Sequence, residues 1–149
     1  MPFNVDGGGF SFCCQDAKFS ICASTWNTRL SQIGRISGTI RIMTHGLPDQ
    51  DFISQIFSKR PENILVIANT DAEAEAKVIK AAFPKVRIAL HSQMNAKVVL
   101  VEPGTVWLSS SDFGKTRSIE SAVGFHSSDL HNRAVEHLFN DQWKKSVEL

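Results

Sequence analysis

The sequence predicts an α/β fold in which a mixed β-sheet is flanked by helices. Two observations predict it. Continuous apolar runs, which are typical of strands buried on both faces, alternate with segments whose apolar residues recur at helical spacing. After residue 97, short strand-like runs follow one another closely, and a helical segment closes the chain. Strands that first alternate with helices and then join through short turns favour a mixed sheet.

Length and composition restrict the class of protein. The 149 residues make a single domain, and 42% hydrophobic with 21% charged residues is ordinary globular composition. A net charge of +1 excludes a protein that coats DNA through a global positive field. The three cysteines have no metal-binding or disulfide spacing. We therefore expect a cytoplasmic protein without a metal or other cofactor, and the absence of any long apolar stretch predicts no membrane partner.

The N-terminal part is glycine-rich, and residues 1–16 are expected to form an arm or hairpin ahead of a domain over residues 17–149. Apolar residues predict a buried strand over residues 18–25. Residues 26–36 have mixed character and are interpreted as a helix that stops near Gly34.

The central part shows clearer signals. Residues 40–43 predict a strand, and Asp49 is placed to cap a helix that ends near Pro61. The apolar run 64–68 predicts a strand buried on both faces. Thr70 and Glu73 have the spacing of a capping box that opens a second helix.

The C-terminal part predicts strands over residues 86–90, 97–101, 105–108 and 122–125, with a Pro-Gly turn between the second and third. Ser127 or Ser128 is then expected to cap a long helix. Its predicted apolar side consists of Leu130, Ala134, Val135, Leu138, Phe139 and Trp143.

The segment from residue 95 to residue 113 has a distinctive spacing. Lys97 is followed by four apolar residues and Glu102, and six further residues separate Glu102 from Ser109-Ser110-Ser111-Asp112. This spacing resembles the phospholipase D superfamily motif H-x-K-x4-D-x6-G-S-x-N. Lys97 and Ser110 keep the family residue types, whereas Asn95 replaces the histidine.

Three further substitutions distinguish this segment from the family motif. Glu102 replaces the aspartate, Ser109 the glycine and Asp112 the asparagine, and Glu120 lies where many relatives of the nuclease branch carry a glutamate. The resemblance implies a phospholipase D-like half-molecule that forms a homodimer, because one chain supplies one motif.

The substitutions predict that catalysis is lost. In the family, the motif histidine attacks phosphorus, but the amide of Asn95 can only donate or accept hydrogen bonds. We expect Lys97 to form salt bridges with Glu102, Asp112 and Glu120, so that the former active site is acidic and repels phosphate. These carboxylates could alternatively bind Mg²⁺ or Ca²⁺, although their spacing is not specific for a metal.

Three functions stay open. A nucleic-acid-binding module would use local basic residues, namely Lys115, Arg117, Arg29 and Arg35. A dimeric regulator or inhibitor would use its surface on a protein partner. An active phosphodiesterase or endonuclease would need a relocated histidine, for which His91 and His126 are the candidates. His131 and His137 are predicted to be surface residues, and His45 to be structural.

Overall fold

The computed structural model describes residues 3, 6, 8–22, 38–114 and 118–149. In this part of the chain, one eight-stranded sheet has the strand order β1-β7-β6-β5-β2-β3-β4-β8. The strands are β1 (Ala17–Cys22), β2 (Ile40–Thr44), β3 (Ile64–Asn69), β4 (Arg87–His91), β5 (Val98–Val101), β6 (Thr105–Ser109), β7 (Glu120–His126) and β8 (Val147–Glu148). The helix expected over residues 26–36 lies outside the described residues.

The sheet is mixed, as the sequence predicts. β2, β3 and β4 are parallel to one another, whereas all the other neighbouring strands are antiparallel. Because β5 runs antiparallel to β2, the start of β5 lies beside the end of β2, with Val98 opposite Met43. This end of the strands carries the motif residues that precede β5.

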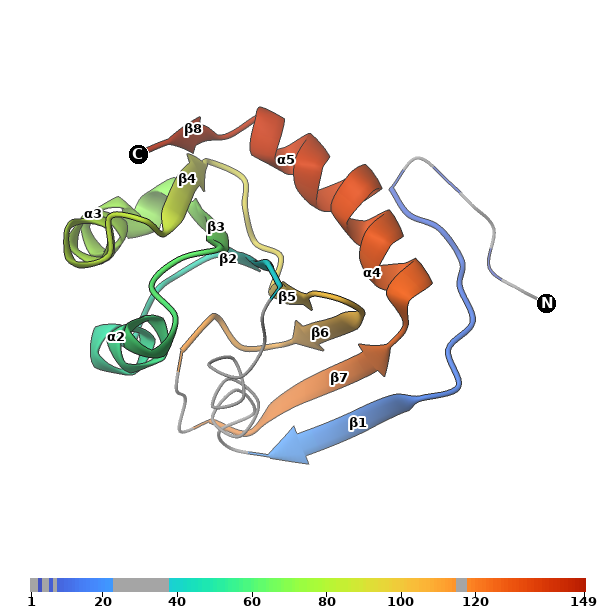
Figure 1. Ribbon diagram of the computed structural model, residues 1–149. Helices are drawn as coiled ribbons and strands as arrows, with labels where there is room; N and C mark the ends of the chain where they lie inside the picture. Colours follow the sequence, from blue (N-terminus) through green and yellow to red (C-terminus); the bar gives the residue numbers. More distant parts are fainter. Residues whose placement is uncertain (1–2, 4–5, 7, 23–37, 115–117) are drawn as a thin grey trace.

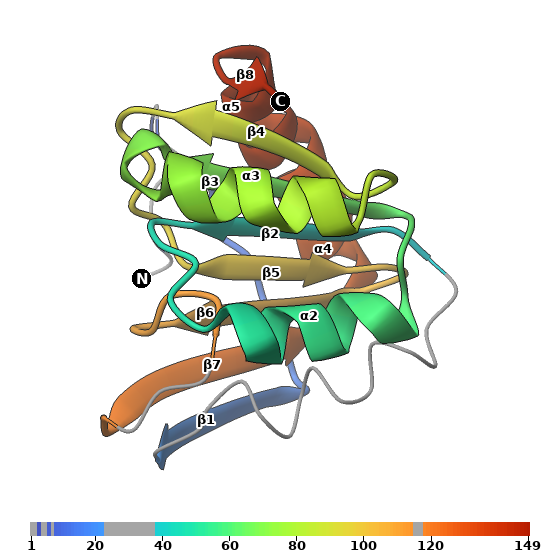
Figure 2. The same cartoon turned by 90° about the vertical axis from the view of Figure 1, so that its left-hand side faces the viewer.

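Helices cover both faces of the sheet (Figures 1 and 2). α2 (Gln50–Lys59) and α3 (Glu73–Ala82) pack on one face. On the other face, α4 (Ser128–Ala134), a π-helical stretch η3 (Val135–Phe139) and α5 (Asn140–Lys144) follow one another without a break. Each face has its own apolar core, centred on Phe57 and Phe113 beneath α2 and α3, and on Phe139 beneath the C-terminal helix.

Two of the three predicted helix starts are confirmed. Asp49 accepts a hydrogen bond from the Phe52 N–H at 3.0 Å, and Ser127 accepts one from the Leu130 N–H at 3.1 Å. The capping box at Thr70 is wrong. A short 3₁₀ turn, η2 (Thr70–Ala72), precedes α3, and the Asn69 side chain caps this turn through the Asp71 N–H at 2.9 Å.

The sequence predicts that the first strand is buried over residues 18–25; its described side chains, residues 18–21, correct this expectation, and residues 23–25 lie outside the described residues. β1 is the edge strand beyond β7, and the side chains of Phe19 and Ile21 are 66% and 63% exposed. The C-terminal helix does not extend over this part of the sheet, so the apolar side chains of β1 stay exposed (Figure 1). The expectation that His131 lies at the surface is also wrong, because this residue of α4 is buried.

The residues before β1 run alongside the C-terminal helix (Figure 1). The Phe12 ring meets the Phe125 ring edge-on at 5.2 Å, and the Arg133 guanidinium lies 4.1 Å from the centre of the Phe10 ring. At the other end of the chain, β8 adds two residues to β4. Among the described residues, no helix is long and apolar enough to cross a membrane.

Candidate functional site

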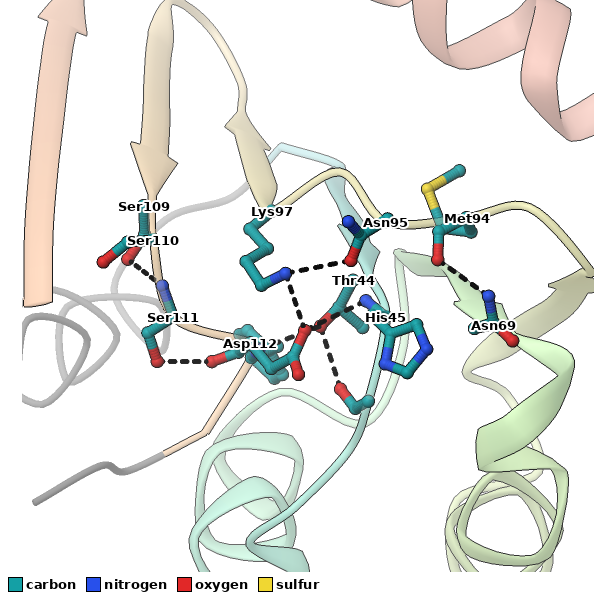
Figure 3. Close-up of polar contacts among 12 residues, drawn as sticks. Thr44, His45, Asn69, Met94, Asn95, Lys97, Ser109, Ser110, Ser111 and Asp112 are labelled. Carbon is teal, nitrogen blue, oxygen red and sulfur yellow. Dashed lines mark hydrogen bonds and ion pairs between the residues drawn. The ribbon is translucent and has the colours of Figure 1, made fainter. Parts of the chain in front are cut away.

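The motif residues meet at one end of the strands, where β2 and β6 end and β5 begins (Figure 3). We call this region the motif end of the sheet. Thr44 is the last residue of β2, Lys97 directly precedes β5, and Asp112 follows β6 by three residues. These three residues are far apart in the sequence. The antiparallel pairing of β5 with both β2 and β6 brings them together.

One oxygen of the Asp112 carboxylate gathers the polar groups of this site. Asp112 Oδ1 lies 3.6 Å from Lys97 Nζ and 3.2 Å from the Thr44 hydroxyl, and it accepts a hydrogen bond from the His45 N–H at 3.1 Å. The other oxygen faces Gly46, where an added Cβ would come within 3.2 Å of it. The carboxylate therefore occupies the cation and the donors that an anionic ligand would need at this point.

Lys97 also interacts with the residue that replaces the motif histidine. Its ammonium donates to Asn95 Oδ1 at 3.2 Å, in addition to its ion pair with Asp112. The predicted pairing of Lys97 with Asp112 is thus present. The Lys97 side chain is 20% exposed, so solvent still reaches it.

Buried polar groups hold the site from below. The Thr44 hydroxyl, which is fully buried, lies 2.8 Å from the Gly46 carbonyl and accepts from the Phe113 N–H at 2.9 Å. The Asn69 amide at the end of β3 donates to the Met94 carbonyl at 2.9 Å and thereby fixes the turn that leads to Asn95 (Figure 3).

The serine run continues the site on the β6 side. Ser109 Oγ accepts from the Ser111 N–H at 3.0 Å, and the Ser111 hydroxyl donates to the Asp112 carbonyl at 2.9 Å. Ser110 instead hydrogen-bonds to the Glu120 carboxylate at the start of β7. The expected salt bridge between Lys97 and Glu120 is therefore wrong: among the described residues, Glu120 pairs with Ser110 and Lys97 forms its ion pair with Asp112.

Glu102 lies away from Lys97, which corrects the expected cluster of three carboxylates. Lys97 and Glu102 flank β5 at its two ends, and five residues of extended chain span roughly 16 Å. Glu102 Oε1 pairs with Arg41 at 3.1 Å, and Glu102 Oε2 accepts from the Thr39 N–H at 3.0 Å. The Thr39 hydrogen bond, followed by Arg41, holds the pKa of Glu102 below its usual value although burial opposes this.

His45 is the histidine that lies closest in the fold to the motif residues. Its backbone N–H donates to Asp112 Oδ1 (Figure 3). Its Nε2 lies 3.4 Å from Asp71 Oδ2, and together with Gly46 and Glu75 these residues line a pocket of about 170 Å³. The sequence predicts only a structural role for His45. Its position directly after an apolar strand, where parallel strands end, was the available signal.

The two histidines expected as substitutes are placed differently. His91 ends β4 opposite Asn69. It therefore lies at the same end of the strands as the site, but two strands away from β2, roughly 10 Å at the usual strand spacing. Its Nδ1 accepts from the Gln93 N–H at 3.0 Å. His126 lies beside Thr105, at the opposite end of β6 from Asp112, with Nδ1 3.1 Å from the Thr105 hydroxyl.

The basic residues expected to bind nucleic acid, Lys115, Arg117, Arg29 and Arg35, lie outside the described residues. Within the described part of the chain, no three His, Cys, Asp or Glu side chains gather closely enough to hold a metal ion. Glu102, Asp112 and Glu120 in particular have separate partners.

Comparison with known proteins identifies the fold. No protein-family model matches the sequence, and no curated protein matches it. Among solved structures, the phospholipase D family member Nuc from Salmonella typhimurium has a TM-score of 0.71 at 18% identity, over 90% of this chain and 99% of Nuc. NucT from Helicobacter pylori has a TM-score of 0.68 at 15% identity, over 90% of this chain and all of NucT, with 100% covered.

A third similar structure is TrmBL2, an archaeal chromatin protein with a novel mode of DNA binding. Its TM-score is 0.62 at 12% identity, over 88% of this chain and 53% of TrmBL2. Nuc and NucT match along nearly their whole length, and this chain has helices on both faces of a mixed sheet (Figure 1). The chain therefore has the nuclease-like fold of the phospholipase D superfamily.

Proposed function

We propose that this protein is a nucleic-acid-binding domain that has lost phosphodiester hydrolysis. The observation that carries the proposal is the position of the Asp112 carboxylate, which pairs with Lys97 and accepts from Thr44 and His45. A phosphate oxygen would need the same donors. The chain has thus replaced a phosphate ligand by a carboxylate of its own.

The chemistry of Asn95 supports the loss of hydrolysis. The amide nitrogen has a delocalised lone pair and does not attack phosphorus. Asn95 Oδ1 instead accepts from Lys97. A phosphodiester that approached Lys97 would also meet Asp112, and two like charges about 4 Å apart repel by about 4 kcal/mol at an effective dielectric constant of about 20.

Binding without hydrolysis is consistent with the segment that follows the site. Lys115 and Arg117 come directly after Gly114, and Arg29 and Arg35 form a second basic group in the sequence. Phosphate contacts from such residues give affinity without reading bases. TrmBL2 has this fold and binds DNA, which supports the same function for this chain.

The binding test uses a fluorescently labelled DNA duplex and measures anisotropy between about 50 and 200 mM salt. We expect salt-dependent binding that weakens when Lys115 and Arg117 are both changed to alanine, with the slope of log K against log salt falling by about 2. The matched control is Lys85→Ala with Lys145→Ala, which removes the same charge from two exposed lysines.

Two results of this test would contradict the proposal. One is no binding even at about 50 mM salt. The other is equal weakening by both pairs of substitutions. Pull-down of a protein that persists after nuclease treatment would instead favour the regulator or inhibitor.

A second candidate function, residual hydrolysis, is favoured by the pairing of His45 with Asp71 beside the motif. A histidine held by a carboxylate is a typical general base. Hydrolysis of bis-p-nitrophenyl phosphate and of plasmid DNA distinguishes the two functions. We expect no turnover above the protein-free rate. Turnover that is lost in His45→Ala or His91→Ala and kept in His137→Ala would overturn the inactive assignment.

A further inference from the structure

The outer edge of β1 is the longest strand edge that no other described strand covers. The Asp16 carbonyl accepts from the His126 N–H at 2.9 Å, so Asp16 belongs to a hydrogen-bonded pair with β7. Hydrogen-bonded and non-hydrogen-bonded pairs alternate along antiparallel strands. The backbone groups of Ala17, Phe19 and Ile21 therefore point away from β7, toward the outside of the sheet.

The same strand has an exposed apolar face. Phe19 lies opposite Val123, which in turn lies opposite Leu108, so the three side chains share one face of the sheet. This is the face that the C-terminal helix covers farther along the sheet (Figure 1). The side chains of Phe19, Ile21 and Leu108 are 66%, 63% and 42% exposed, because the C-terminal helix does not extend over this part of the sheet (Figure 1). Exposed edges of this kind are templates for strand pairing.

We propose that β1 pairs with β1 of a second copy of this chain, antiparallel and about a two-fold axis at Ser20. In this register, Phe19 of each copy lies opposite Ile21 of the other. The outward backbone groups of these residues then form hydrogen-bonded pairs across the new interface. The two sheets become one continuous sheet, and the exposed apolar face doubles its length on a single side.

Self-complementarity argues for a second copy as the occupant. Strand residues that lie directly opposite point to the same face, so the register must match positions of equal parity. The Ser20 axis does so and forms two aromatic–β-branched pairs, which stabilise antiparallel strands. It also places the ammonium of Lys18 opposite Cys22 rather than opposite its own copy. No like charges face each other, and both copies use the same surface, as a two-fold interface requires.

The outer edge of β1 is distinct from the motif end of the sheet. The motif residues lie where β5 starts and β6 ends, whereas β1 is separated from β6 by β7. A dimer formed through the motif, as the family resemblance implies, would leave the outer edge of β1 free. Substitutions on β1 therefore distinguish the two contacts.

The first test measures mass against concentration by sedimentation equilibrium for Phe19→Lys and Ile21→Lys. Val78→Lys is the matched control, because Val78 is an apolar residue on α3 that is 59% exposed. We expect the wild-type chain and the control to dimerise alike. Each β1 variant should raise the dissociation constant at least tenfold while its circular dichroism is unchanged. A wild-type monomer at every concentration, or a dimer that survives both β1 variants, would overturn the proposal.

The second test checks the register by disulfide trapping. In a chain whose cysteines are changed to serine, Ser20→Cys places one thiol on the two-fold axis in a non-hydrogen-bonded pair. Such pairs have Cα atoms about 4.5 Å apart, within the range of about 4.4–6.8 Å that a disulfide spans. We expect rapid oxidation to a covalent dimer, compared with Val147→Cys on the other edge strand. Cross-linking of Ser20→Cys no faster than that of Val147→Cys would overturn the Ser20 register.

Discussion

At residue 112, a single side chain changes the charge of the motif end of the sheet. An asparagine there would leave the Lys97 ammonium without a counter-ion, whereas the Asp112 carboxylate neutralises it at 3.6 Å. The carboxylate is also well supported, because Thr44 and the His45 N–H both face the same oxygen. The site is therefore a finished internal network rather than a vacant ligand site.

Asp112→Ala should destabilise the fold. The substitution leaves the His45 N–H without its acceptor and Lys97 without its counter-ion, which costs about 1–3 kcal/mol, whereas the Thr44 hydroxyl keeps the Gly46 carbonyl at 2.8 Å. Urea denaturation measures the free energy of unfolding. Asp141→Ala is the control, because it removes an exposed carboxylate that pairs with Lys145 at 3.2 Å on one helix face, a pair with an expected worth below about 0.5 kcal/mol. Equal losses in the two variants would refute the structural role of Asp112.

The residues of the site were partly predictable from sequence. The motif spacing predicts that Lys97 meets Asp112, because strands joined by a tight turn bring the start of one beside the end of the next. It does not show that Thr44 and His45 complete the site, since no spacing rule links residue 44 to residue 112. The position of Glu102 was predictable but missed: a strand separates it from Lys97 by its own length.

Among the elements, β2 and β5 are joined at their far end by Glu102. Its carboxylate accepts from the Thr39 N–H and pairs with Arg41, and these contacts hold the pKa of Glu102 below its ordinary value, with burial acting against them. A carboxyl group with a lowered pKa in the folded state stabilises the fold above its unfolded pKa. This contribution is lost as the pH falls through the folded pKa.

Glu102→Gln should therefore reduce stability at pH 7 and have little effect well below about pH 4, where the wild-type carboxyl group is protonated as well. Urea denaturation at a series of pH values gives the difference in unfolding free energy. Glu62→Gln serves as the control, because its carboxylate is 57% exposed and lies 3.5 Å from Lys85. If the Glu62 variant shows the same pH-dependent difference, the Thr39 and Arg41 contacts are not its cause.

The cross-strand contact between β6 and β7 depends on a missing side chain. Gly124 lies opposite Trp107, and a Cβ at residue 124 would overlap the indole ring. Gly124→Ala should therefore cost about 1–3 kcal/mol of unfolding free energy through overpacking. Gly9→Ala is the control, since no atom lies within 4 Å of its added Cβ. Thermal and urea denaturation compare the two, and a neutral Gly124→Ala would contradict this packing.

Elements with a strong periodic pattern were predictable, and those decided by tertiary context were not. The apolar run at residues 64–68 is β3, because a central parallel strand needs apolar side chains on both faces. β1 has a similar composition but lies at the edge, and composition does not report position in a sheet. β8 has two residues and no period. His131 is buried because it belongs to α4, which packs against β5 and β6.

For the molecule as a whole, the order of strands separates the two ends of the sheet. β1 and β8 form opposite edges, so the arm before β1 and the chain end after β8 leave from different sides (Figure 1). The parallel strands β2, β3 and β4 lie between the motif strands and β8. The strands β5 and β6, which carry the motif residues, and the edge strand β1 therefore all lie in the antiparallel half of the sheet.

The two edges of the sheet also differ in length, with six residues in β1 and two in β8. This difference sets the valency of assembly through the sheet. A filament of stacked strands needs two long edges on each copy, one for each neighbour. This sheet has one such edge among its described strands, and a two-fold contact at β1 uses it in both copies. Growth by strand addition therefore terminates at two chains, and the protein can expose an apolar strand without polymerising.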